Sequence, residues 1–360
     1  MGCTEIVTAW TAFLQPDVFP GLAVALVKAL ALFSAAVAEA RHCQSGRVAA
    51  KARGRATAAS QRRRWERWLA HPRFDAAAVQ RDLARAVWQR WPAARATLIL
   101  DETPKANDLR CLCVRLAYRR RAVPLASACY RLGRPSGGLP RLVRRLLDQA
   151  TEHRPARVAV VLLADRGLAW PALVDYCTRR GWHYLLRLQG QTRVRLATGR
   201  VVTARDLAPA RGAAPWLGRA EVFKKAGWRA GAVGAWWAAS AAEPWLLLMD
   251  GAACAGRWRQ YARRMWIEEA FRDEKSQGFQ WQQSRVNDPV RAGRLLAILG
   301  LATLLALSAG SWLVKRGARR WFDPRQRWRL SVFQLGLHGL DTFFRRPGLN
   351  WRPQFYFYPS

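Results

Sequence analysis

The sequence predicts an α/β fold built on a mixed sheet with flanking helices, interrupted by a second group of strands. Between residues 91 and 188, apolar and alternating segments predict three strands, a helix, a fourth strand, a helix and a fifth strand. Residues 189–256 consist of short alternating segments separated by Gly and Pro, which is typical of a β-rich insertion. Residues 1–90 have the Ala- and Leu-rich spacing of helices.

The order of the five core strands is the plan of the ribonuclease-H-like fold. Asp101 directly follows the apolar run ATLIL. Asp165 follows the almost wholly apolar run VAVVLLA, which is typical of a central strand covered on both faces. In that fold the first and fourth strands lie side by side. We therefore expect Asp101 and Asp165 to be neighbours although they are far apart in the chain.

The helical N-terminal region contains two predicted helix starts and a basic stretch. Ser60 could cap a helix that runs to Leu69, and Asp75 could cap a helix from Ala76 to Trp88. Residues 41–73 contain ten Arg and Lys residues but a single acid, Glu66, and two tryptophans are interspersed among them. A solvated charged helix and a DNA-contacting module both explain this stretch.

The stretch Tyr261–Lys275, with the sequence YARRMWIEEAFRDEK, carries a third acidic position. On a continuous α-helix, Tyr261, Arg264, Glu268 and Lys275 would lie within about 60° of one another. A single carboxylate then shares its face with a phenol, a guanidinium and an ammonium group. A solvated helix with i,i+4 charge pairs is the alternative. Glu269 competes with Glu268 but points about 100° away.

The composition is strongly basic, with 60 Lys and Arg residues against 24 Asp and Glu and a formal net charge of +36. Such an excess repels itself unless a polyanion neutralises it, and duplex DNA is the obvious partner. A GC-rich genome would explain the preference for arginine but not the net charge. The seven Cys and five His show no disulfide or zinc spacing, which indicates a reducing cytoplasm and argues against a His-based hydrolase.

These residues resemble one large bacterial group, the DDE transposases of insertion-sequence family four. The spacing within Tyr261–Lys275 matches the Y-R-E-K signature of the group. Asp101 in LILDET and Asp165 in LLADRGL look like its first two acidic positions. Leu168 departs from the pattern, because the group usually has an aromatic residue shortly after the second aspartate.

The resemblance runs from about residue 60 to about residue 315 and implies a metal-dependent polynucleotidyl transferase. It implies that Asp101, Asp165 and Glu268 are catalytic and hold two Mg²⁺ or Mn²⁺ ions, with Asp101 as the bridging ligand. Hard cations prefer oxygen ligands, and neither Cys nor His accompanies these acids in the sequence. The chemistry of the residues and the resemblance therefore agree.

The resemblance also implies DNA contacts. Arg264 and Lys275 would hold phosphates beside the scissile bond, and Tyr261 would hydrogen-bond a phosphate. In some relatives an aromatic residue of the insertion stacks on a base flipped out of the transposon end, so Trp236 and Trp237 are candidates. Packing in the core is the more common role for tryptophans in strands.

The predicted organisation has five parts. They are a basic helical DNA-binding region (1–90), the first part of the core (91–188), the β-rich insertion (189–256), the second part of the core with the glutamate helix (257–316), and a basic aromatic tail (317–360). The tail suits phosphate contact and stacking, or packing onto the catalytic domain or a second protomer. Leu295–Val314 is long and apolar enough to span a membrane, but the resemblance places a buried helix there.

The expected function is cut-and-paste transposition of an insertion sequence. A homodimer would synapse two transposon ends, recognise their terminal inverted repeats, cleave the strands and join them to target DNA, in the bacterial cytoplasm at the nucleoid and without a membrane. Water attacks first and releases a 3′-hydroxyl that attacks a second phosphodiester; a hairpin intermediate is implied by the resemblance only. One alternative is a DNA-binding relative of the same fold that has lost catalysis. The other is a membrane-anchored basic protein built around Leu295–Val314.

Overall fold

The computed structural model describes residues 3–52, 54, 56–105, 108–251, 254, 256–323, 329–345 and 351–358. Within these residues one sheet of ten strands runs through the molecule, in the order β3-β2-β1-β4-β5-β10-β9-β8-β6-β7. The strands are β1 (Arg95–Pro104), β2 (Leu109–Tyr118), β3 (Arg121–Arg131), β4 (Ala159–Ala164), β5 (His183–Arg187), β6 (Arg193–Leu196), β7 (Val201–Thr203), β8 (Trp216–Val222), β9 (Arg229–Trp236) and β10 (Trp245–Met249).

β1 to β5 form one half of the sheet, in the order β3-β2-β1-β4-β5. β1 pairs antiparallel with β2, and β2 with β3, whereas β1, β4 and β5 run parallel. The expectation that the first and fourth strands are neighbours is confirmed. Leu100 lies opposite Ala164 in the β1–β4 ladder, so Asp101 and Asp165 follow at the same edge of the sheet.

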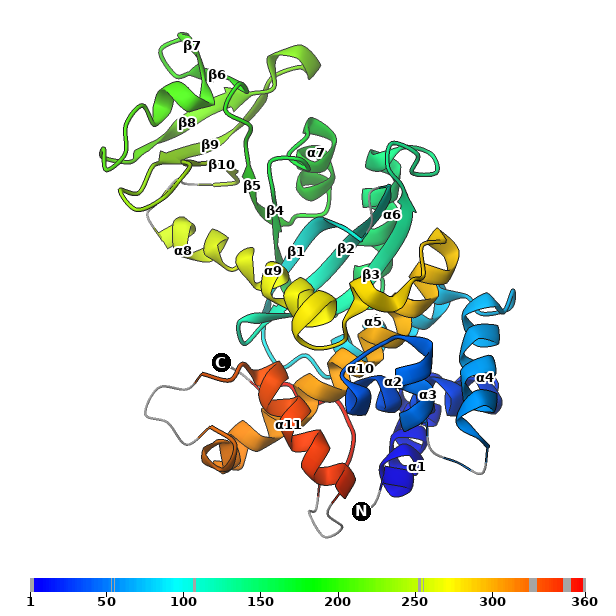
Figure 1. Ribbon diagram of the computed structural model, residues 1–360. Coiled ribbons are helices and arrows are strands. Elements are labelled where there is room, and N and C mark those ends of the chain that lie inside the picture. The colour runs from blue at the N-terminus through cyan, green and yellow to red at the C-terminus, as the bar shows by residue number, and fades with distance from the viewer. Residues whose placement is uncertain are drawn as a thin grey trace.

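The sheet is larger than the five strands expected. β10 pairs antiparallel with β5, with Leu247 opposite Arg187, and β9, β8, β6 and β7 continue outward. The strands of the insertion therefore extend the core sheet and project away from the N-terminal helices (Figure 1). An edge strand leaves backbone N–H and C=O groups unpaired, and β10 supplies their partners along β5.

The N-terminal region is helical, as predicted. It contains α1 (Cys3–Phe13), the π-helical turn η1 (Leu14–Val18), α2 (Val24–Ala40), α3 (Ser45–Lys51), α4 (Ala58–Ala70) and α5 (Ala76–Gln89). Asp75 caps α5 as expected, because its Oδ1 accepts hydrogen bonds from the amides of residues 77 and 78. The cap predicted for α4 is wrong: Thr57 Oγ1 accepts from the Ser60 amide, so the helix begins earlier, at Ala58.

α4 divides cleanly into a buried and an exposed face. Trp65 is buried with its ring centroid 5.0 Å from that of Phe33, and the half-buried Trp68 lies 4.7 Å from Phe74. These tryptophans hold the helix to the rest of the protein. The opposite face carries four exposed arginines, at positions 62, 63, 64 and 67.

The remaining helices lie around β1 to β5 or connect the insertion back to them. They are α6 (Leu139–Thr151), α7 (Pro171–Arg179), α8 (Gly256–Ala262), α9 (Met265–Arg272), the π-helical segment η4 (Asp273–Gln277), α10 (Pro289–Lys315) and α11 (Val332–Arg345). Short 3₁₀ turns are η2 (Ala204–Leu207), η3 (Lys224–Ala226), η5 (Trp281–Ser284) and η6 (Ala318–Trp321).

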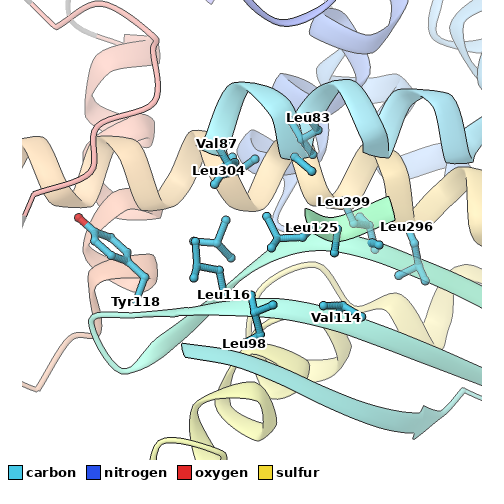
Figure 2. Packing of buried hydrophobic residues seen from close by; sticks show 14 of the residues in the cluster. Leu83, Val87, Leu98, Val114, Leu116, Tyr118, Leu125, Leu296, Leu299 and Leu304 are labelled. Carbon is cyan, nitrogen blue, oxygen red and sulfur yellow. The ribbon is translucent and has the colours of Figure 1, made fainter. Parts of the chain in front are cut away.

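α10 contains the apolar stretch that raised the question of a membrane span. Among the described residues it is the one helix long and apolar enough to cross a bilayer, and 89% of its most apolar window is buried inside the protein. It packs against β3, α2, α5 and α11. Figure 2 shows leucines of α10 and α5 directed at apolar side chains of β1, β2 and β3. This burial favours a core helix.

Two glycines let α10 and α11 touch through their backbones. A Cβ atom on Gly310 would lie 1.9 Å from the Val332 carbonyl oxygen, and one on Gly336 would lie 1.8 Å from the Ala306 carbonyl oxygen. Neither helix could bear a larger residue at these positions without separating.

The aromatic residues of the tail pack on the chain itself. The Phe355 ring centroid lies 5.2 Å from that of Phe13, and the Phe357 ring lies 5.3 Å from Tyr118. Trp351 is buried and stacks on Phe343. Of the alternatives for the tail, packing onto its own protein accounts for these aromatics; Arg325, Arg327 and Arg346 lie outside the described residues.

Candidate active site

The three acids predicted to be catalytic meet at one edge of the sheet. Asp101 lies in β1, Asp165 directly follows β4, and Glu268 lies in α9. The Nη2 atom of Arg264 lies 3.1 Å from Asp101 Oδ2, 3.4 Å from Asp165 Oδ2 and 3.0 Å from Glu268 Oε1. We call these four residues the acidic cluster. A single cationic nitrogen thus contacts carboxylates from three separate elements.

The backbone that places Arg264 differs from the predicted continuous helix. α8 ends at Ala262 and α9 begins at Met265, and the intervening turn uses i→i−3 hydrogen bonds, such as the Arg264 amide to the Tyr261 carbonyl at 2.8 Å. After α9 the chain widens into the π-helical segment η4. The prediction of one α-helix over Tyr261–Lys275 is therefore wrong, although the tight turn still brings Arg264 to Glu268.

Burial controls the charge state of Asp101, whose residue is 7% exposed. Burial raises the pKa of its carboxyl group to about 7, against the opposing effect of Arg264 and with a further rise from Glu268. The Glu102 amide also donates a hydrogen bond of 2.9 Å to Asp101 Oδ1. The raised pKa shows that the nearby positive charge does not offset the burial of this carboxyl group.

Arg187, at the end of β5, is a second cation that the sequence analysis missed. Its Nη1 atom lies 3.6 Å from Asp165 Oδ1, and its Nη2 atom lies 2.9 Å from Glu243 Oε2 in the insertion. Asp165 Oδ1 is buried and accepts no hydrogen bond from the described residues. Arg187 could have been predicted as a site residue, because it ends β5, the strand that pairs with β4.

Tyr261 and Lys275 lie near the acids without binding them. The Tyr261 hydroxyl is buried and has no hydrogen-bond partner among the described residues, and its ring lies edge-on to Trp245. Burial and the Asp165 charge raise its pKa. Lys275 is half-buried over the ring of Phe271, and burial lowers its pKa. Within the described part of the chain Lys275 forms no ion pair with the three acids.

Glu269 points away from the acidic cluster, as its position in the helix predicts. Its carboxylate pairs with Arg272 at 2.9 Å and approaches Arg121 at 3.7 Å. The two adjacent glutamates therefore face different partners, and the geometry separates Glu268 from Glu269.

Two pockets open beside the acidic cluster. The larger, about 600 Å³, is lined by Asp101 and Asp165 together with Glu102, Tyr130, Leu132, Gly133, Pro135, Gly138, Leu139, Gly167 and Leu168. The smaller, about 260 Å³, lies between the core and the insertion and is lined by Arg166, Arg187, Leu188, Gly190, Arg205, Trp237, Ala242, Glu243, Pro244 and Leu246. Arg187 connects the two, because it contacts Asp165 and lines the smaller pocket.

The two candidate tryptophans of the insertion have different surroundings. The Trp236 ring lies 5.8 Å from the ring of Trp258 and packs with it. Trp237 lines the smaller pocket, and the Arg205 guanidinium lies 4.0 Å from its ring centroid. Only Trp237 of this pair belongs to a pocket next to the acids.

Residues 138–305 match a family model described as a transposase DDE domain. The matched range contains Asp165, Arg264 and Glu268 and begins after Asp101, which the sheet brings back to them. No curated protein matches the chain at a significant level. The family match supports a DDE transposase, a class that acts on DNA with divalent metal ions.

Proposed function

We propose that this protein is a DDE transposase that cleaves and joins DNA strands at the ends of an insertion sequence. The observation that carries the proposal is the convergence of Asp101, Asp165 and Glu268 on one cationic nitrogen, beside a pocket of about 600 Å³. The strand order of β1 to β5 supports a ribonuclease-H-like core. The Y-R-E-K spacing supports insertion-sequence family four.

The donor set of the acidic cluster suits Mg²⁺ or Mn²⁺. All three groups are carboxylates, which hard cations prefer, and Asp165 Oδ1 is a buried oxygen without a hydrogen bond from the described residues. Asp101, Asp165 and Glu268 would be the residues that hold the ions. When bound, such ions activate an attacking oxygen and stabilise the leaving oxygen of a phosphodiester.

The residues of the chain itself would bind and orient DNA. The Tyr261 hydroxyl has no hydrogen-bond partner in the described part of the chain and would donate to a phosphate oxygen, while Arg264 and Lys275 supply positive charge beside the acids. Exposed arginines at positions 62, 63, 64 and 67 of α4 and at 141, 144 and 145 of α6 offer further phosphate contacts. The net charge of +36 supports duplex DNA as the substrate, including the terminal inverted repeats and the target.

The smaller pocket has the character of a nucleotide site. It combines the Trp237 ring with the guanidinium groups of Arg166, Arg187 and Arg205. Arg166 and Arg187 both pair with Glu243 of the same pocket, which leaves an aromatic ring beside a net positive charge. Its volume of about 260 Å³ suits one nucleotide rather than a duplex. Trp237 is therefore the better candidate for contact with an unstacked base, and Trp236 is a packing residue. Two copies of the chain would hold two transposon ends.

The test is cleavage of a labelled duplex that carries the end of the element encoding this protein, with Mg²⁺ or Mn²⁺. The wild type is compared with Glu268→Gln and with the matched neighbour Glu269→Gln. We expect Glu268→Gln to lose cleavage by at least about a thousandfold while it still binds the DNA, and Glu269→Gln to keep most of it. DNA binding without cleavage by all three proteins would favour a non-catalytic DNA-binding relative. Equal cleavage by all three would remove Glu268 from the site.

A further inference from the structure

We propose that Arg264 is a built-in counter-cation that holds the three carboxylates together before metal loading and must leave the cluster when metal binds. This inference rests on the proposed function, because it assigns the acids as metal ligands. It gives Arg264 a positioning role in addition to phosphate binding. Metal and Arg264 would then compete for the same oxygens.

The contacts of Arg264 are those of a centred positive charge. One atom, Nη2, faces all three carboxylates at 3.0 to 3.4 Å. The Nε atom is buried without a hydrogen-bond partner among the described residues, and Nη1 contacts only the Met265 sulfur, at 3.5 Å. Arginine frequently binds a single carboxylate through two parallel N–H···O hydrogen bonds. Arg264 does not form such a bidentate pair, because its Nη2 atom alone faces the three carboxylates.

The separations in the cluster are those of carboxylates around a guanidinium and are longer than metal–ligand distances. Mg²⁺ binds its oxygen ligands at about 2.0–2.1 Å, well inside the distances to Nη2. In the described part of the chain, no group of three Asp, Glu, His or Cys is arranged to hold a metal ion as it stands. The acids are spaced around Arg264, so they can close on a metal only after its side chain has moved.

Solvent borders the turn that carries Arg264, so its side chain can move outward. It lies in the short turn between α8 and α9, and its neighbour Met265 is 49% exposed, so this turn borders solvent. Displaced toward that surface, the guanidinium would face the phosphates of bound DNA. Arrival of DNA would thus remove Arg264 from the acids and favour metal loading in the assembled complex.

The test measures Mn²⁺ binding to the full-length protein without DNA, by the electron paramagnetic resonance signal of free Mn²⁺. We compare the wild type with Arg264→Gln, with Asp101→Asn to identify binding at the acids, and with Arg263→Gln as the matched control. Arg263 lies in the same turn but contacts Thr97 and Trp266, not the acids. We expect Arg264→Gln to bind Mn²⁺ about tenfold more tightly, or about 1.4 kcal/mol. Arg263→Gln should change affinity by less than about threefold.

Each outcome decides the matter. Equal or weaker binding by Arg264→Gln, or an equal gain in Arg263→Gln, overturns the counter-cation. If the wild type and Arg264→Gln bind no more tightly than Asp101→Asn, the acids are not a metal site and the proposed function fails with the inference. Folding of Arg264→Gln only in the presence of Mn²⁺ supports the inference, because the metal then replaces the missing cation. If this variant folds under neither condition, the uncharged variant Arg264→Met is titrated, and affinity no tighter than wild type overturns the inference.

Discussion

Two charge clusters lie at opposite ends of the same short helical segment, and they are built differently. At the start of α9, the acidic cluster gathers three carboxylates around Arg264, with Arg187 farther away. At its end, a paired cluster matches each acid with its own arginine. Glu274 contacts Arg115 at 2.6 Å, and Asp273 contacts Arg121 at 2.5 Å.

The two clusters differ in charge balance, as we expect for a structural ion pair and a proposed metal site. Arg115 and Glu274 are each 3% exposed at the side chain, and the Arg115 guanidinium also covers the ring of Phe271. Such a pair fixes η4 against β2 and leaves little net charge to attract a ligand. The acidic cluster keeps more negative than positive charge beside a pocket, which costs folding free energy and is useful for binding a cation.

The largest effect on stability is expected at the paired cluster. Glu274→Gln leaves the Arg115 charge buried without its partner, and two other nitrogens of that guanidinium already lack hydrogen bonds from the described residues. The free energy of unfolding should fall by about 3–5 kcal/mol, measured by urea denaturation. The double variant Arg115→Met with Glu274→Leu should recover most of this loss. A loss below about 1 kcal/mol for Glu274→Gln would contradict a structural role.

Asp273 should make stability depend on pH. Burial raises its pKa to about 6 in spite of Arg121. The folded protein therefore retains a proton that the unfolded chain releases, and its contribution to stability is present below about pH 4 and lost as pH rises through about 6. In the wild type this loss is at most about 3 kcal/mol. Urea denaturation across this range should show a shallower fall for Asp273→Asn, and parallel pH profiles would count against the assignment.

Glu268→Gln should change stability much less than Glu274→Gln, although both remove one glutamate charge from the same helical segment. Glu268 is one of three acids in a cluster with surplus negative charge, and its side chain is 41% exposed. The free energy of unfolding without metal should change by less than about 1 kcal/mol in either direction. If Glu268→Gln lowered the free energy of unfolding as much as Glu274→Gln does, the proposed difference between the two clusters would be wrong.

The smallest effect is expected at the pair between them on the outer face of α9. Arg272 and Glu269 are 52% and 35% exposed at their side chains. Arg272→Gln should lower the free energy of unfolding by no more than about 0.5 kcal/mol, and added salt should abolish the difference. A salt-independent loss above about 1 kcal/mol would show that exposure does not govern the strength of these pairs.

The features predicted correctly from the sequence depend on short-range pattern. Apolar runs predict the five strands β1 to β5 in their order along the chain. The parallel pairing of β1 with β4 then brings Asp101 and Asp165 to one edge of the sheet. The cap at Asp75 follows from one side chain and the amides two and three residues further on. The contact between Arg264 and Glu268 follows from their i,i+4 spacing.

The features that were missed depend on partners distant in the chain. No local pattern shows that β10 pairs with β5, since the choice between a separate and a shared sheet is made by long-range hydrogen bonds. Arg187 gains its significance from Asp165 and Glu243, which lie on either side of it in sequence. The break between α8 and α9 contains neither Gly nor Pro, so the residue types there gave no basis for predicting it.

The shared sheet has a mechanical consequence. Because β10 is hydrogen-bonded to β5, the insertion cannot swing as a hinged lid without rupturing a backbone ladder, and Arg187 opposite Leu247 sits on that seam while touching Asp165. The protein is therefore stiff where the two halves meet. Duplex DNA, the proposed substrate, bends at a cost of about 1–6 kcal/mol over 20–30 base pairs, so we expect the DNA rather than this seam to deform when the two bind.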